Sequence, residues 1–170
     1  WHYRSCHESL IDFCNKEYYE NELITFPSAD CMKSKVCLKQ VEGIYDRGHS
    51  MRNYDEAQAC VAYIQEKINQ GDSRSYGIIT INKKQRDLIE QLIKCKAEQD
   101  SDFAKALRKN QENSEELFVR NLETVQGDER DVIIFSFGYG RDADGCFPVN
   151  FGPLQRAGGW RRLNVALSRA

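Results

Sequence analysis

The chain has 170 residues, 41% of them hydrophobic, which is enough for one domain with its own core. Its 24 basic and 26 acidic residues give a net charge of −2, so any nucleic-acid contact must come from a local basic face. No run of 18 apolar residues and no basic-then-apolar N-terminal signal occurs, which excludes a membrane-spanning protein and leads us to expect a cytoplasmic one.

The first predicted element is an amphipathic helix that follows Tyr3 and Arg4. Either Ser5 or Ser9 could cap it. Its apolar side chains recur at helical intervals, at Leu10, Ile11, Phe13, Cys14 and Tyr18. Residues 22–34 are expected to form a loop. A strand should follow, because apolar and polar residues then alternate, with apolar side chains at Val36, Leu38 and Val41.

The middle of the chain predicts two helices around a short strand. Residues 43–53 form a polar loop that ends at Asn53, a suitable N-cap. The helix expected at 54–69 has an apolar face made of Ala57, Cys60, Val61, Ile64 and Ile68. Gly77–Asn82 predicts a strand, and the helix after it should bury Leu88, Ile89, Leu92 and Ile93.

The next part of the chain changes from charged to apolar. Residues 98–116 are rich in charge and predict a solvated helix and loop, with a further strand over 117–122. A polar turn around Gly127 then leads into Val132–Phe135. This β-branched apolar run is typical of a buried parallel strand.

The C-terminal end combines a long loop with a short helix. Six of the eleven glycines and two of the three prolines lie from Gly138 to Gly159, which predicts an irregular loop. Its expected anchors are Phe147, Phe151, Leu154 and Trp160. The stretch RRLNVALSRA predicts a helix that still contains Arg169, with an apolar face made of Leu163, Val165, Ala166 and Leu167.

Cysteine usage argues against disulfides and metal. The seven cysteines are odd in number and show no CxxC spacing, so we expect reduced thiols, several of them in the core. His2, Cys6 and His7 match none of the usual structural zinc patterns, and no metal site is expected. Because the chain starts at Trp1 without Met and stops at Ala170, we expect a fragment of a longer protein.

Residues 122–137 (LETVQGDERDVIIFSF) and 161–170 (RRLNVALSRA) closely resemble motifs V and VI of superfamily 1 helicases. The branch concerned includes the nonsense-mediated-decay RNA helicases and bacterial helicase-like proteins. Tyr3-Arg4-Ser5 resembles motif IV, and Gly77–Asn82 resembles the GIIT element of the same branch. The resemblance covers nearly the whole chain. It implies that residues 1–170 are the second RecA-like domain, an α/β fold of P-loop NTPase type with a mainly parallel sheet flanked by helices.

The resemblance also implies a nucleotide site. In that family Tyr3 would stack on the base, while Arg4 and Arg169 would act as catalytic cations at the γ-phosphate. Gly127 and Glu129 would border the nucleotide, with the Glu129 carboxylate on the ribose. The cofactors implied are ATP and Mg²⁺.

The metal ion would be held mainly by a missing first RecA-like domain. This chain has no GxxxxGK[ST] phosphate loop, so it lacks its own Walker A cradle. Asp128 and Glu129 resemble a Walker B pair, but they precede their apolar strand, whereas a Walker B carboxylate follows its strand.

The family further implies a contact with single-stranded DNA or RNA. It nominates Thr80 and Asn82, with Gln85 as a third candidate, and places Thr124 on a nucleic-acid phosphate. Gln126 would link the strand site to the nucleotide site. The residues alone leave an alternative open, because Thr80 and Asn82 could simply satisfy the amides of the following helix.

The function expected is therefore the C-terminal motor domain of an ATP-dependent helicase. It would complete the ATP site and the nucleic-acid track together with the first RecA-like domain of the same chain, and the fragment alone should be inactive. The alternative is a motor-dead nucleic-acid-binding or scaffolding domain that keeps the fold. An independent nucleotide-binding enzyme is disfavoured, because the phosphate loop is absent.

Overall fold

A computed structural model describes residues 7–30, 33–112, 116–125 and 127–169 of the chain. In chain order its elements are η1 (Glu8–Leu10), α1 (Asp12–Tyr18), α2 (Tyr54–Asn69), β1 (Tyr76–Thr80), α3 (Lys83–Gln99), α4 (Ser101–Glu112), β2 (Phe118–Asn121), β3 (Val132–Ser136), η2 (Gly152–Leu154) and α5 (Gly159–Leu167).

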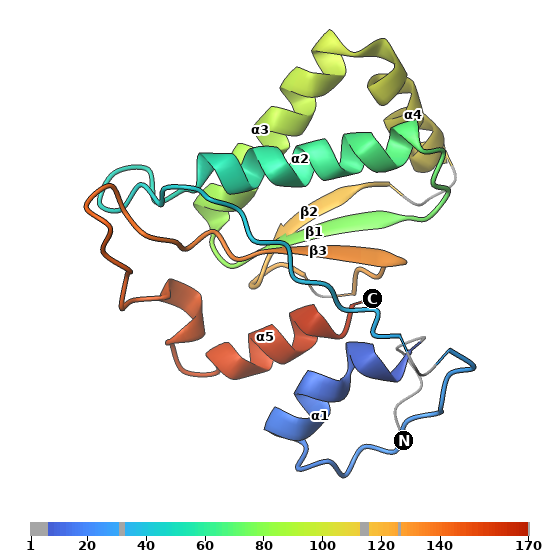
Figure 1. The fold of residues 1–170 in the computed structure, drawn as a ribbon, viewed down its shortest axis with the longest axis vertical. Helices are drawn as coiled ribbons and strands as arrows, with labels where there is room; N and C mark the ends of the chain where they lie inside the picture. The colour runs from blue at the N-terminus through green and yellow to red at the C-terminus, as the bar shows by residue number, and fades with distance from the viewer. Residues whose placement is uncertain (1–6, 31–32, 113–115, 126, 170) are drawn as a thin grey trace.

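The three strands form a parallel sheet in the order β2-β1-β3. At its carboxyl edge Thr80 pairs with Asn121 on one side and with Ser136 on the other. The α2, α3 and α4 helices cover one face of this sheet, and α5 lies on the other (Figure 1). The expected α/β fold with a parallel sheet flanked by helices is confirmed.

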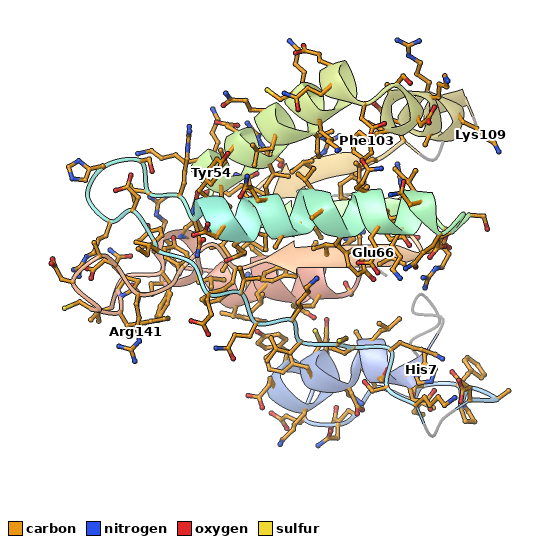
Figure 2. The ribbon with its side chains drawn as sticks, turned by 45° about the horizontal axis from the view of Figure 1, so that its top comes forward. His7, Tyr54, Glu66, Phe103, Lys109 and Arg141 are labelled. Carbon is orange, nitrogen blue, oxygen red and sulfur yellow. The ribbon has the colours of Figure 1, made fainter. Side chains whose placement is uncertain are left out.

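The two faces of the sheet follow from the alternation of side chains along each strand. Ile78 points to the core shared with α2, α3 and α4, whose largest fully buried side chain is Phe103. Figure 2 shows Phe103 between α3 and α4. Ile79 points to the opposite core, which also contains Tyr139 from the loop after β3 and Ala166 from α5.

A close approach fixes the choice of glycine in β1. The Phe118 ring of β2 lies against Gly77, and a Cβ atom at that position would overlap the ring. Because β1 is the central strand, any larger side chain there would push the two strands apart.

The predicted helices at 54–69 and after residue 82 are confirmed as α2 and α3. Each begins at an asparagine N-cap: Asn53 Oδ1 accepts from the Glu56 amide at 3.1 Å, and Asn82 Oδ1 accepts from the Gln85 amide at 2.8 Å. Leu88 and the other predicted inner residues of α3 pack into the core.

The strand predicted around residues 36–41 does not form. Val36 is 61% exposed and Leu38 is 92% exposed, and no described strand pairs with this segment. Alternation stabilises a strand only where one face is buried, and here neither face meets the core.

The N-terminal helix is shorter than predicted. The segment starts as the 3₁₀ turn η1, which His7 caps through a bond from the Ser9 amide, and α1 follows without a side-chain cap. The Ser9 hydroxyl instead accepts from the Lys35 amide at 2.9 Å. Capping by Ser9 is therefore wrong, and Ser5 lies outside the described residues.

The C-terminal expectations need three corrections. The β3 strand is parallel as predicted, but residues 132–135 are only partly buried because β3 is an edge strand. The long loop is irregular apart from η2; Phe151 and Leu154 anchor it, whereas Phe147 and Trp160 are about half exposed. The α5 helix ends at Leu167, so Arg169 lies beyond it.

The cysteines divide into buried and exposed thiols. Burial raises the pKa of Cys60 to about 12 and that of Cys14 to about 11, as expected for core thiols. Cys37, Cys95 and Cys146 are exposed instead. Across the described ranges, no helix combines the length and apolar character needed to cross a bilayer.

Candidate functional site

The first group of predicted site residues lies at the carboxyl edge of the sheet, where ligands commonly bind in open parallel sheets. Thr80 ends β1 and is fully buried, and its hydroxyl donates to the Asn82 carbonyl at 2.9 Å. Asn82 caps α3. The alternative, in which both residues satisfy amides of the next helix, is therefore confirmed for Asn82, which accepts from the Gln85 amide, but not for Thr80, which donates to a carbonyl. The contacts with single-stranded nucleic acid stay predictions.

The Asn82 Nδ2 donor is buried and has no well-aligned hydrogen-bond partner among the described residues. The Tyr139 side chain lies beside it, and the interaction with Asn82 opposes the rise in the Tyr139 pKa that burial causes. A buried amide donor left unpaired costs about 1–3 kcal/mol. A phosphate or carbonyl oxygen would relieve that cost if the side chain turned toward solvent, because Nδ2 is closed off from solvent here.

Thr124 stands at the same edge, just after β2. Its hydroxyl donates to Asn121 Oδ1 at 2.6 Å and accepts from the Asn121 amide at 3.2 Å. Asn121 pairs with Thr80 in the sheet, so the structure brings Thr124 and Asn82 to one edge. Thr124 itself is exposed. Gln126 lies outside the described residues.

A buried polar bridge supports this edge. Gln85 is fully buried, and its side chain accepts from the Asn53 amide at 2.8 Å and donates to the Asn53 carbonyl at 3.0 Å. The Glu56 carboxylate accepts from the Ser136 hydroxyl at 2.6 Å and from the Gly138 amide at 2.9 and 3.0 Å. These bonds tie α2 and α3 to the loop after β3.

Sequence reasoning missed Glu56 altogether. Glu56 is one of several polar residues on an amphipathic helix, and its partners Ser136 and Gly138 lie 80 and 82 positions away. The local sequence pointed to this bridge only through the polar residues that follow each strand.

The second group lies toward the amino edge of the sheet. The turn that contains Gly127 (φ 94°) carries the chain back to this edge, where Val132 pairs with Tyr76. Among the described residues no atom lies within 4 Å of the position of a Cβ on Gly127, and Glu129 is exposed. The five residues of β1 span about 13 Å, which separates this group from the carboxyl edge.

Arg169 joins the second group through the backbone. Its carbonyl accepts from the Arg130 amide at 3.2 Å, immediately after Glu129. The side chain is 7% exposed, and its Nε donates to the Val165 carbonyl at 3.0 Å, at the end of α5. A cation at a helix C-terminus is favourable, which explains this folded-back position.

The N-terminal segment packs against α5. The rings of Tyr18, at the end of α1, and Trp160, at the start of α5, lie 5.5 Å apart, and Tyr19 accepts from Asn164 at 2.7 Å. The two helices therefore run in opposite directions (Figure 1), so α1 begins at the end of α5 that leads to Arg169. Tyr3 and Arg4 lie outside the described residues.

Side chains that could ligate a metal ion are dispersed over the described residues. Within the part of the chain that the structure describes, no group of three or more His, Cys, Asp or Glu side chains could hold a metal ion. Asp128, one half of the acidic pair, bonds Arg120 at 3.1 Å.

Comparison with known proteins places these features in a family. Residues 1–170 match the model of the AAA_12 family, described as an AAA domain. The chain is 39% identical over 175 residues to a Mycoplasma genitalium protein named "Uncharacterized ATP-dependent helicase MG140", and 38% identical to a Mycoplasma pneumoniae homolog. Both alignments cover this whole chain but only 15% of each relative. The chain belongs to the AAA domain family, with the RecA-like fold of helicase-like superfamily 1 proteins.

Proposed function

We propose that this chain is the second, C-terminal motor domain of a superfamily 1 helicase. In the longer protein it would complete the ATP site and the nucleic-acid track together with a first RecA-like domain. The observation that carries the proposal is the bond between the Arg130 amide and the Arg169 carbonyl. It brings two stretches far apart in the sequence, each with a residue suited to nucleotide chemistry, to one place on the fold.

On the nucleotide side, the domain would supply cations and not a phosphate cradle. Arg169 and Arg4 would offset the negative charge that develops on the transferred phosphoryl group, because a guanidinium stays charged and matches phosphate oxygens bidentately. Tyr3 would cover the base, and Gly127 and Glu129 would contact the sugar side. In the structure the Arg169 side chain binds a neutral carbonyl, which a phosphate would replace as a stronger partner.

On the strand side, the carboxyl edge would hold the backbone of single-stranded DNA or RNA. Asn82 has a donor to spare and Thr124 is exposed, while Thr80 would act through Asn82 because it is buried. Gln126 would connect the strand to the nucleotide. ATP binding would close the two domains, and hydrolysis would reopen them, so that a strand gripped at this edge is advanced.

The test compares the full-length protein with the isolated chain. We expect the full-length protein to hydrolyse ATP with Mg²⁺ and to be stimulated by single strands. Residues 1–170 alone, checked for folding by circular dichroism, should hydrolyse none and should bind single strands weakly, with a shallow salt dependence.

Three outcomes would change this proposal. Magnesium-dependent turnover by the isolated chain would refute it. A full-length protein that binds strands without hydrolysing ATP would support the motor-dead alternative. Submicromolar, sequence-specific binding of duplexes by the isolated chain would indicate a dedicated recognition domain.

A further inference from the structure

The loop after β3 presents a row of aromatic rings at the carboxyl edge of the sheet. The centroid of Phe151 lies 5.9 Å from that of Phe137 and 6.0 Å from that of Phe147. Phe137 is 39% exposed and Phe147 is 50% exposed. Val149, in the same loop, is 82% exposed. Large apolar side chains gathered in this way mark a binding surface more often than an ordinary stretch of surface.

Two of these rings rest on a fixed support. Phe137 stands between Ser136 and Gly138, and the Glu56 carboxylate holds both neighbours. Below it, the buried Tyr139 ring lies 5.8 Å from Phe137 and 5.5 Å from Phe151. The backbone around Phe137 is therefore held in place although its ring reaches solvent. Rings held in this way lose little conformational freedom when a partner binds.

Tyr139 and the following residues are anchored in turn by the loop before α2. The Tyr139 ring lies 5.2 Å from the buried Tyr45 ring, and the Tyr45 amide donates to the Arg141 carbonyl at 2.9 Å. The two loops run beside each other beyond the sheet (Figure 1), and Figure 2 shows Arg141 on the outer part of the second loop. The aromatic row is thus part of a two-loop structure that projects from the carboxyl edge.

The row of rings continues the carboxyl edge of the sheet, where the candidate contacts with single-stranded nucleic acid lie. Ser136, which precedes Phe137, pairs with Thr80. The Tyr139 side chain lies beside the Asn82 amide. On the far side, Arg156 reaches Glu123, the neighbour of Thr124, at 3.9 Å. A strand lying on Asn82 and Thr124 would therefore pass next to the exposed rings.

Part of the charge on this surface is paired. Arg47 lies 3.6 Å from Asp142, and Arg156 lies 3.9 Å from Glu123, so these two guanidinium groups each have an acid close by. Arg141 uses one of its nitrogens to bond the Gly145 carbonyl at 2.8 Å. The two ion pairs weaken the attraction of this loop for phosphates, and the exposed rings give it an apolar means of binding.

We propose that Phe137, Phe151 and Phe147 form a base-stacking platform for single-stranded nucleic acid, an inference that rests on the function proposed above. Every base offers a flat π face, so aromatic rings hold successive bases without regard to sequence. The platform adds a contact with bases to an edge where the polar candidates can contact only the backbone. A segment of the same protein or another protein could also cover apolar rings, and the test separates these occupants.

The test uses the full-length protein and a single-stranded oligonucleotide carrying the fluorescent base 2-aminopurine. We expect fluorescence quenching on binding, and a roughly tenfold weaker affinity for Phe147→Ala and for Phe137→Ala. Phe13→Ala is the matched control. Phe13 is also aromatic and 51% exposed, but it lies on α1, so its loss should leave the affinity unchanged.

An oligonucleotide with abasic sites completes the design and needs no variant. Wild-type protein should bind it roughly tenfold more weakly than the intact strand, whereas Phe147→Ala, which keeps two of the three rings, should show a smaller difference between the two strands. If the full-length protein binds no strand at all, the proposed function fails together with the platform. If it binds strands but loses nothing with abasic sites or with either Phe variant, the platform alone is refuted. If the Phe variants lower the stability of the full-length protein but leave its affinity for intact and abasic strands unchanged, the rings contact another part of the protein instead.

Discussion

The two faces of the sheet differ in how they are covered. On one face α2, α3 and α4 form a regular helical layer over a sealed core that includes the fully buried Phe103. On the other face the nine-residue helix α5 shares the cover with loops, and several large apolar side chains stay exposed there. The regular face provides stability, while the irregular face holds most of the residues suited to ligand chemistry.

The helical layer still contributes to the candidate site, through the starts of its helices. The caps Asn53 and Asn82 both lie at the carboxyl edge, and Glu56 and Gln85 extend from the first turns of α2 and α3. The regular face therefore positions the loops of the irregular face. Single substitutions can test these two roles separately.

The largest expected effect is on the irregular face, at Arg169. In the full-length protein, Arg169→Ala should lower ATP turnover by roughly 10³-fold or more, by analogy with arginine fingers. Strand binding should change little, because Arg169 lies away from the carboxyl edge. The measurement is the steady-state rate of hydrolysis at saturating single strands.

Two further variants make this prediction specific. Arg169→Lys should rescue poorly, since lysine keeps the charge but loses the planar fork. Arg4→Ala should cause a loss as large as that of Arg169→Ala, if both arginines act on one phosphate. Wild-type turnover in both Ala variants would show that this domain is not the trans-acting half of a motor.

The second prediction concerns the helical face. Phe103→Ala should destabilise the domain by about 3–5 kcal/mol, because the ring is fully buried where α3 and α4 meet. Hydrogen exchange of the β1 amides in the full-length protein would report the loss. Phe26→Ala, at a side chain that is 60% exposed, is the control. Equal exchange in both variants would mean that α4 is not part of the sealed layer.

Two helices of this face, α2 and α3, were predicted well from the sequence, whereas α4, expected to be a solvated helix, buries Phe103 in the core. Apolar residues at helical spacing, such as Ala57, Val61 and Ile64, form one face of a helix that packs on a core. Periodicity therefore located α2 and α3 correctly. The same reasoning failed at Val36 and Leu38, because alternation cannot tell whether a sheet is there to receive the strand.

Side-chain partners in the candidate site were harder to predict. Motif resemblance named Arg169, but its bond to Val165 follows from where α5 stops, which helix propensity alone does not fix. The bonds from Ser136 and Gly138 to Glu56 join residues from different elements, and no local pattern encodes such pairs. The exposure of Phe147 was likewise missed, because an aromatic residue in a loop predicts an anchor by default.

The third prediction separates capping from ligand contact at Asn82. Asn82→Ser keeps a capping oxygen and removes a buried donor without a well-aligned partner, so stability should not fall. It removes the unpaired Nδ2 donor, so strand affinity should fall by about tenfold if that donor binds a phosphate. Asn53→Ser, the same change at the cap of α2, should leave the affinity unchanged. Unaltered strand binding by Asn82→Ser would leave Asn82 with a capping role only.

The smallest expected effect lies at the amino edge of the sheet, where Asp131 joins the ends of two strands. Its carboxylate accepts from the Ser75 amide and hydroxyl, both at 2.8 Å, and these hydrogen bonds hold the pKa of Asp131 below its ordinary value. A lowered folded-state pKa means that the stabilisation is complete above the unfolded pKa, near pH 4, and is lost as the pH falls through the folded value. Because Asp131 is exposed, Asp131→Asn should cost less than about 1 kcal/mol at neutral pH. Denaturant unfolding from neutral to acidic pH should show the gap from wild type narrowing below about pH 4, with Asp102→Asn, whose side chain is 85% exposed on α4, as the control. A gap that stays constant over this range would show that the charge of Asp131 does not strengthen the junction of β1 and β3.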